Sequence, residues 1–194
     1  MAEALCALLS EIRACQHCAA YLPHGLRPVV QAGDGARLLI VGQAPGTRVH
    51  ASGLPWDDAS GARLREWLGL DETTFYDPAQ VALMPMGFCF PGTGPSGDLP
   101  PRPECAPLWH ERLRTALPKI RLTLLVGQYA QARYLAARPR RSLTEAVRCH
   151  AKAPDGLFPL PHPSWRVAPW MRKNPWFEAE VLPLLRTKMA AALG

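Results

Sequence analysis

The chain has 194 residues and carries 22 Lys and Arg against 16 Asp and Glu, a formal net charge of +6 at pH 7. This length suits a single domain over residues 1–194, here expected to be a monomer, with a core that needs no disulfides. The positive charge favours a polyanionic partner, although basic proteins of other functions are common. Because no apolar run reaches the ~20 residues of a membrane span and the first residues lack a signal-peptide pattern, we expect a cytoplasmic protein without membrane contact.

The elements follow from the spacing of apolar residues. Helical spacing predicts a helix over 2–14, and the apolar run 37–42 is typical of a buried strand, followed by a loop as far as Gly61. A helix over 60–68 ends at Gly69. Further along the chain the pattern predicts strands at 81–86, 122–127 and 158–160, and helices at 108–117, 128–137 and 174–191.

This alternation of short apolar strands with helices indicates an α/β fold, a three-layer α/β/α sandwich with a short, mostly parallel central sheet. In such sheets, ligands bind beyond the carboxyl ends of the strands. The segments 42–61 and 162–166 both follow strands there, and they hold the residues that suggest chemistry.

The first of these segments opens with Gly42, Gln43, Ala44, Pro45 and Gly46 directly after the first strand. Its two glycines allow a ligand to approach the backbone closely. The motif is too short for a phosphate-binding loop and lacks the dinucleotide fingerprint. Taken alone, it is also compatible with an ordinary turn.

The second segment is His162-Pro163-Ser164, followed by Trp165 and Arg166. A lone histidine is more often structural than catalytic. In this position, however, its imidazole is able to donate a hydrogen bond to an oxygen that gains negative charge. Trp165 and Arg166 have the chemistry to touch a duplex or to wedge into it if the polyanionic partner is DNA. If the partner is DNA, we expect Ser164 to bond to a phosphate.

Together, in this order and separation, the two motifs resemble the uracil-DNA glycosylase superfamily, whose members carry Gly-x-x-Pro-Gly/Tyr after the first core strand and His-Pro-Ser late in the chain. The resemblance covers about residues 10–187. It looks closest to the iron–sulfur bacterial and archaeal branch, with GQAPG here in place of GEAPG and Gly53-Leu54-Pro55-Trp56 in place of Gly-x-Pro-Phe. It implies an enzyme that hydrolyses the N-glycosidic bond of uracil in DNA and leaves an abasic site.

The cysteines extend this resemblance. Cys15, Cys18, Cys89 and Cys105 follow the order and rough spacing of that branch's ligands to a 4Fe-4S cluster. From the residues alone, a set of four cysteines favours iron–sulfur or zinc, and an empty site is the further alternative. Cys6 and Cys149 are left over as buried or free thiols.

The resemblance also assigns roles in a base pocket. His162 is the expected donor to the leaving uracil, and the backbone around Gly42 and Ala44 lines the pocket. Trp56 is expected to stack on the flipped base, with a half-buried core aromatic as the alternative.

The acidic residues that the family carries in its first motif are missing at the matching positions of this chain. The branch has Glu where this chain has Gln43, and the well-studied uracil-specific branch has Asp where it has Ala44. Gln43 orients water but is not a base. We therefore expect Asp58 rather than Asp57 to be the catalytic carboxylate, because Asp58 resembles the aspartate of another branch. The alternative is that it caps the following helix.

Recognition of uracil differs as well. The branch has an asparagine where this chain has Pro85, so we expect backbone groups or another side chain near 86–88 to take over, with Phe88 in the base pocket. Basic side chains in the surrounding loops are candidates for DNA contact, with a solvated surface role as the alternative for each one singly: Arg48, Arg102, Arg166, Arg172 and Lys173. The missing acid at Gln43 leaves a second function open, a uracil-DNA binding protein without efficient turnover.

Overall fold

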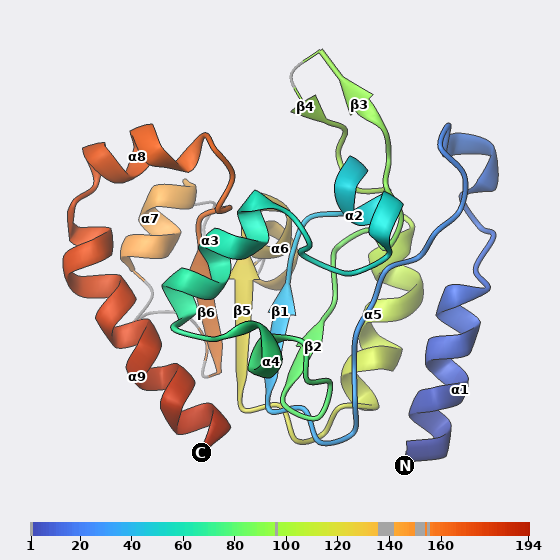
Figure 1. Ribbon diagram of the computed structural model, residues 1–194, viewed down its shortest axis with the longest axis horizontal. Coiled ribbons are helices and arrows are strands. Elements are labelled where there is room, and N and C mark those ends of the chain that lie inside the picture. Colours follow the sequence, from blue (N-terminus) through green and yellow to red (C-terminus); the bar gives the residue numbers. More distant parts are fainter. Residues whose placement is uncertain (1, 96, 136–141, 150–153, 155) are drawn as a thin grey trace.

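The centre of the fold is a four-stranded parallel sheet (Figure 1). The computed structural model describes residues 2–95, 97–135, 142–149, 154 and 156–194. The strand order is β2-β1-β5-β6, with β1 pairing in parallel with both β2 and β5, and β5 with β6. The strands are β1 Leu38–Val41, β2 Val81–Leu83, β5 Leu122–Val126 and β6 Leu157–Leu160.

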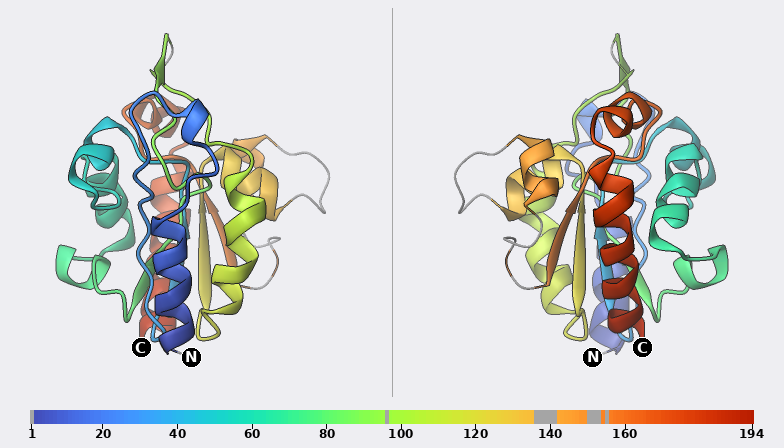
Figure 2. Two further views of the ribbon diagram at one scale, coloured as in Figure 1. Left: turned by 90° about the vertical axis from the view of Figure 1, so that its right-hand side faces the viewer. Right: turned by 90° about the vertical axis from the view of Figure 1, so that its left-hand side faces the viewer.

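Both faces of the sheet are buried, because successive side chains of a strand point to opposite sides. In β1, Leu38 and Ile40 enter one core, and Leu39 and Val41 enter the other. The first core is covered by α3 (Ala59–Leu68), α4 (Glu72–Phe75), the π-helical turn Phe177–Val181 and α9 (Leu182–Leu193). The second is covered by α1 (Ala2–Arg13), α5 (Cys105–Thr115) and α6 (Gln128–Tyr134). Figure 2 shows helices on both sides of the sheet, so the predicted three-layer sandwich is confirmed.

Some short elements were not predicted. The expected loop after β1 contains α2 (Thr47–Ser52), which is capped by Gly46 and by the left-handed Gly53. Other unpredicted elements are α4, α7 (Leu143–Arg148), α8 (Val167–Lys173), β3 (Thr93–Gly94) and β4 (Gly97–Asp98). Elements of this length offer too few residues for a period to be recognised.

Boundaries also shift. The strand β2 ends at Leu83 rather than at 86, and α5 begins at Cys105 rather than at 108. The helix predicted over 174–191 begins instead with the π-helical turn Phe177–Val181. The end of the helix predicted over 128–137 lies outside the described residues. These differences are of the size expected at element ends.

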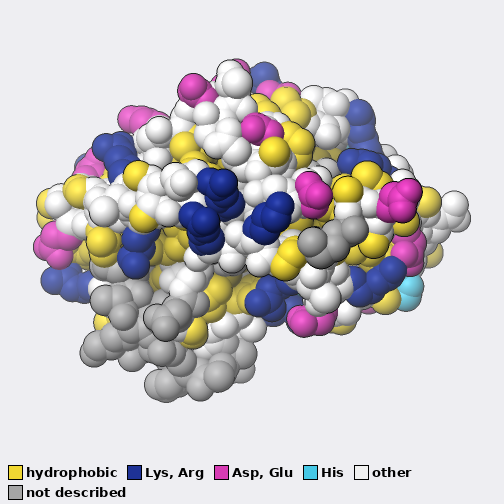
Figure 3. All heavy atoms as spheres, turned by 90° about the horizontal axis from the view of Figure 1, so that it is seen from below, with side chains coloured by type: hydrophobic (Ala, Val, Ile, Leu, Met, Phe, Trp, Pro, Cys, Tyr) yellow, Lys and Arg dark blue, Asp and Glu magenta, His cyan; other side chains and the backbone are white. Residues whose placement is uncertain are grey.

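Because all four strands are parallel, their carboxyl ends share one edge of the sheet, where the loops after β1 and β6 meet and the β3–β4 hairpin projects (Figure 1). Seen from the opposite end, Lys and Arg lie in the middle of the face among scattered Asp and Glu (Figure 3). Positive charge therefore does not by itself locate a DNA surface. None of the described helices combines the length and apolarity needed to cross a membrane.

Candidate active site

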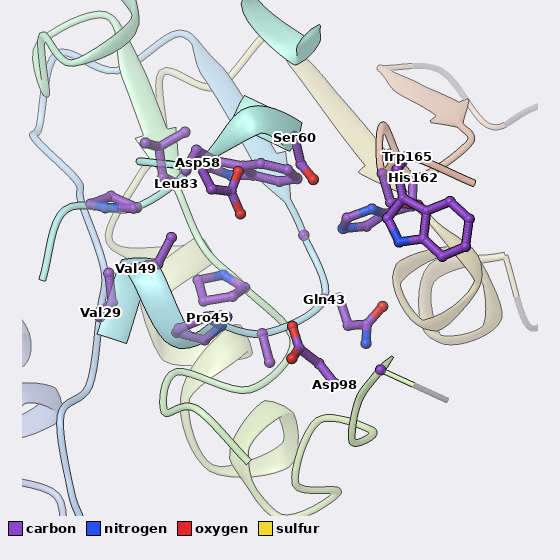
Figure 4. A pocket seen from close by; sticks show the side chains of 18 of the residues that line it. Val29, Gln43, Pro45, Val49, Asp58, Ser60, Leu83, Asp98, His162 and Trp165 are labelled. Carbon is purple, nitrogen blue, oxygen red and sulfur yellow. The ribbon is translucent and has the colours of Figure 1, made fainter. Parts of the chain in front are cut away.

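A pocket of about 390 Å³ lies at the carboxyl edge of the sheet (Figure 4). Six segments line it: the stretch at Val29, the loop after β1 with α2, the segment that leads into α3, the end of β2 with Pro85, the end of the β3–β4 hairpin, and the loop after β6. Figure 4 shows Gln43 and His162 toward one side and the apolar Val29, Val49 and Leu83 toward the other. The two motifs singled out in the sequence therefore share one pocket.

The first motif lines the pocket, and hydrogen bonds from the segment after β2 fix its backbone. Gly42 O accepts from Met86 N at 2.9 Å, and Gln43 O accepts from Gly87 N at 3.0 Å. Among the described residues, nothing accepts a hydrogen bond from the amides of Gln43 and Ala44. Since unsatisfied backbone donors seek partners, these two N–H groups are available to a ligand.

Trp56 forms an aromatic wall against this motif. A β-carbon built on Gly42 would lie 2.7 Å from Trp56 Cζ2, so only glycine permits this approach. Trp56 has φ 60°, which is unusual for a bulky residue. Its carbonyl packs on Gly61, where a β-carbon would lie 1.8 Å from Trp56 O. The indole is half-buried and also packs against the first core, so it is both a pocket wall and a core aromatic.

Asp58 lines the pocket and also caps α3. Its Oδ1 accepts from Gly61 N at 2.8 Å, in the manner of an N-cap residue. This bond uses one oxygen of the carboxylate and leaves Oδ2 for a ligand. Asp57 is not among the residues that line the pocket, and it pairs with Arg48 at 3.5 Å. The structure therefore places Asp58, rather than Asp57, beside His162.

His162 enters the same pocket from the loop after β6, with its ring stacked 5.7 Å from the Trp56 ring at 29°. Burial lowers its pKa, and the charge of Asp58 opposes that shift. The imidazole is therefore neutral at pH 7. Its Nδ1 is buried and has no hydrogen-bond partner among the described residues. The nitrogen left to face a ligand is Nε2.

Arg63 holds this loop in place, a role that the sequence did not suggest. Its Nη1 donates to Pro163 O at 3.0 Å and to Ser164 O at 2.9 Å. Since Arg63 is on α3, the helix that Asp58 caps, one helix positions both the carboxylate and the histidine loop.

Ser164, Trp165 and Arg166 form the rim next to His162. Trp165 is 75% exposed, and the Arg166 guanidinium lies 5.1 Å from the centre of its ring. An exposed tryptophan at the mouth of a pocket is well placed to contact a large partner.

The segment 86–88 does not take the predicted position. Phe88 is absent from the pocket lining; it is 1% exposed and packs in the second core, 5.9 Å from the His110 ring. The amides are occupied as well, since Met86 N and Gly87 N bond to the first motif and Phe88 N donates to Cys105 Sγ at 3.4 Å. These donors are thus unavailable to a base, and only Pro85 of this region lines the pocket.

Cys15, Cys18, Cys89 and Cys105 line a second, small apolar cavity between α1 and α5. Burial raises the pKa of Cys105 to about 12, and it also raises the pKa values of Cys18 and Cys89. Among the described residues, no group of three or more His, Cys, Asp or Glu is arranged to hold a single metal ion. Nevertheless, the sequence correctly anticipated that the four thiols gather in one place.

A backbone N–H group points at one of these sulfurs. Phe88 N donates to Cys105 Sγ at 3.4 Å, and Arg102 lines the same cavity. Arg102 also pairs with Glu104 and lies 4.4 Å from the centre of the Tyr21 ring. Arg102, which the sequence suggested as a candidate for DNA contact, lines the cysteine cavity.

Asp98 was missed by the sequence interpretation. It lines the pocket at the end of the β3–β4 hairpin. Burial raises the pKa of Asp98, the charge of Asp58 raises it further, and a hydrogen bond from Thr93 opposes both effects. The hairpin is too short and too polar for a strand pattern, so the available signal was a carboxylate directly after a glycine-rich segment.

A sequence model of the family described as Uracil DNA glycosylase superfamily matches residues 30–186. The matched segment includes both motifs, Asp58, Asp98, Cys89 and Cys105, and it begins after Cys15 and Cys18.

Proposed function

Because the chain belongs to the uracil-DNA glycosylase superfamily, whose members act on DNA, we propose that it hydrolyses the N-glycosidic bond of uracil in DNA and leaves an abasic site. The observation that carries the proposal is the meeting of Asp58 and His162 in one pocket beside Trp56. A base reaches such a pocket only after its nucleotide leaves the stack.

On the base side, the leaving uracil gains negative charge as the bond to the sugar breaks. A neutral His162 donates a hydrogen bond from Nε2 to a uracil oxygen, and its own charge state does not change. The free amides of Gln43 and Ala44 supply further donors. The flipped base stacks on one face of the Trp56 indole. Because the indole already stacks on the His162 ring, either the two rings separate or the base stacks on the opposite face of Trp56.

On the sugar side, positive charge builds up as the base leaves. The carboxylate of Asp58 stabilises this charge with Oδ2, while Oδ1 remains bonded to Gly61 N. Gln43 orients water. The helix cap fixes the carboxylate before substrate binds, which is the preorganisation that electrostatic catalysis requires.

The DNA contacts lie at the rim. Ser164 bonds to a phosphate beside the flipped nucleotide, and Trp165 with Arg166 packs against the duplex that the nucleotide has left. The side chains of Trp165 and Arg166 are exposed, as such contacts require.

The proposal includes a 4Fe-4S cluster held by Cys15, Cys18, Cys89 and Cys105. The donor set fits: four thiols line one cavity, and Phe88 N donates a hydrogen bond to Cys105 Sγ. Such hydrogen bonds stabilise thiolates and tune clusters. The role of the cluster is structural, joining the N-terminal region to α5.

One assay tests the enzymatic proposal. The protein is incubated with an oligonucleotide that contains a single uracil, the products are treated with alkali, and strand cleavage is measured. Cleavage at the uracil position is expected. A tight complex without cleavage would support the binding protein without turnover and overturn the proposal.

Variants of the two central residues test their roles. We expect His162→Ala to lower the single-turnover rate by about 10²- to 10³-fold and Asp58→Asn by at least about 10²-fold, with DNA binding retained. Asparagine remains a good N-cap, so Asp58→Asn removes charge without removing the cap. The matched control is Asp57→Asn, which removes the neighbouring carboxylate outside the pocket. If Asp58→Asn is as active as Asp57→Asn, the assignment of the carboxylate is wrong.

Metal content tests the cluster separately. Protein purified without oxygen should contain iron and acid-labile sulfide and show broad visible absorbance, lost when Cys89 or Cys105 is changed to alanine. Stoichiometric zinc in place of iron would contradict the cluster and support zinc, the alternative metal.

A further inference from the structure

The β3–β4 hairpin brings a second carboxylate to the pocket. Figure 4 shows Asp98 and Asp58 on opposite walls, with both carboxylates turned toward the space between them. They come from different segments, since Asp58 begins α3 and Asp98 ends β4. The residue Asp98 as a whole is exposed, but its carboxylate lies at the pocket mouth, where neighbouring atoms displace part of its water.

The backbone of the hairpin fixes this placement. In the hairpin register Asp98 lies opposite Thr93, and Thr93 Oγ1 lies 3.5 Å from Asp98 Oδ1. Gly92 and Gly97 have φ values of 101° and 108°, a region that favours glycine. On the pocket side, a β-carbon built on Gly46 would lie 3.1 Å from Asp98 Oδ2, so the carboxylate touches the first motif.

Asp98 has no ion-pair partner among the described residues. The groups around it are Thr93 on the hairpin, Asp58 across the pocket, His162 on the loop after β6, and Arg166, which lies near Gly97. Burial raises the pKa of Asp98, the hydrogen bond from Thr93 opposes this rise, and the like charge of Asp58 adds to it. A carboxylate placed in a pocket under these conditions is a candidate for proton transfer.

The two carboxylates differ in their hydrogen bonding. Asp58 Oδ1 accepts a short bond of 2.8 Å from Gly61 N. Asp98 has only the long contact with Thr93. Pairs of acids whose environments differ in this way commonly divide the work between an ionised stabiliser and a proton acceptor.

We propose that Asp98 is the general base of the site, accepting the proton of the water that attacks C1′, while Asp58 stabilises the positive charge on the sugar. This inference rests on the proposed glycosylase function. The bond from C1′ to the base nitrogen breaks and its electron pair stays on the base. The water oxygen bonds to C1′, and one water proton moves to the Asp98 carboxylate. That proton then passes to solvent or to the departed base.

The test is Asp98→Asn, an isosteric change, measured by single-turnover excision of uracil from pH 4.5 to 8.5. We expect a loss of about 10²-fold at neutral pH, the usual contribution of a general base. Wild-type activity should fall as the pH is lowered through the pKa of Asp98, because the protonated acid cannot accept a proton. This fall should persist in Asp58→Asn and vanish in Asp98→Asn.

Asp34→Asn is the matched control, since it also removes one exposed negative charge but lies in the loop before β1, outside the pocket. It should retain wild-type rate and pH profile. Thermal unfolding and DNA binding of Asp98→Asn should match those of the control, since the hairpin lies outside both cores.

The outcomes separate the inference from the proposed function. Excision by wild type together with an Asp98→Asn rate within threefold of Asp34→Asn would overturn the role of Asp98 alone. The role of Asp98 would also be overturned if Asp98→Asn is slow but its excision rate still falls at low pH. A structural defect would slow the enzyme and leave the pH profile unchanged. If wild-type protein excises no uracil at any pH, both proposals are overturned.

Discussion

Replacing Arg63 with alanine should uncouple the two halves of the site. Arg63 Nη1 donates to Pro163 O at 3.0 Å and to Ser164 O at 2.9 Å, and no other described side chain donates to these two carbonyls. Without the guanidinium, the loop that carries His162 is free to shift relative to Asp58. A shift of about 1 Å at a catalytic group costs about 10²-fold in rate, equivalent to about 3 kcal/mol in the activation free energy.

The loss should also appear in stability, but to a smaller extent. A hydrogen bond from a charged donor contributes about 1.5–3 kcal/mol. Because Arg63 is only part-buried, water replaces part of what is lost, and we expect the free energy of unfolding to fall by about 1–2 kcal/mol. Arg63→Lys should recover only part of the rate. Both bonds come from the single nitrogen Nη1, whose place an ammonium group can take, but the flexible lysine stem fixes that group less rigidly than the planar guanidinium.

The assay compares single-turnover excision with thermal unfolding, and Arg65→Ala is the control. Arg65 is on the same helix but pairs with Glu72 at 2.8 Å, away from the pocket. Arg65→Ala should lose stability and keep the rate, whereas Arg63→Ala should lose mainly rate. Equal rates for the two alanine variants would refute the coupling through α3.

Three further substitutions each test one structural feature of the protein. Burial lowers the pKa of His110 to about 4, so between about pH 6.5 and 4 the unfolded chain binds a proton that the folded chain does not. Stability should therefore fall by about 3 kcal/mol as the pH drops across that window, and urea titrations of His110→Gln should show a flatter dependence. Gly42→Ala should slow excision without loss of DNA binding, because its β-carbon would displace Trp56. Trp165→Ala should weaken DNA binding in a gel-shift assay and leave the melting temperature unchanged, since the side chain is 75% exposed.

The sequence was sufficient for the features that depend on repetition or on chain order. The strands were recognisable because residues such as Leu39 and Ile40 are buried on opposite faces, which leaves an unbroken apolar run. The shared position of Gln43 and His162 followed from parallel strands, whose carboxyl ends meet at one edge.

Features that depend on tertiary packing were not predictable. Phe88 was expected in the pocket because it lies near the position of a base-recognising asparagine in the family, yet the chain turns it into the core beside His110. Asp98 had no pattern to reveal it, because its strand has two residues and both are exposed. Arg63 resembled any exposed helix arginine until its carbonyl partners, about 100 positions later, were in view.

The missing acid of the first motif is compatible with glycosylase chemistry because the position of a carboxylate matters more than its origin in the chain. At the first motif, the amides of Gln43 and Ala44 have no acceptor among the described residues, and both residues line the pocket. In the proposed mechanism the negative charge comes instead from Asp58, which is fixed by its cap to Gly61. Since an N-cap bond engages only one oxygen, the same residue begins a helix and offers its second oxygen to the sugar. The capping and catalytic interpretations of Asp58 are therefore complementary, and Asp58→Asn separates them by keeping the first and removing the second.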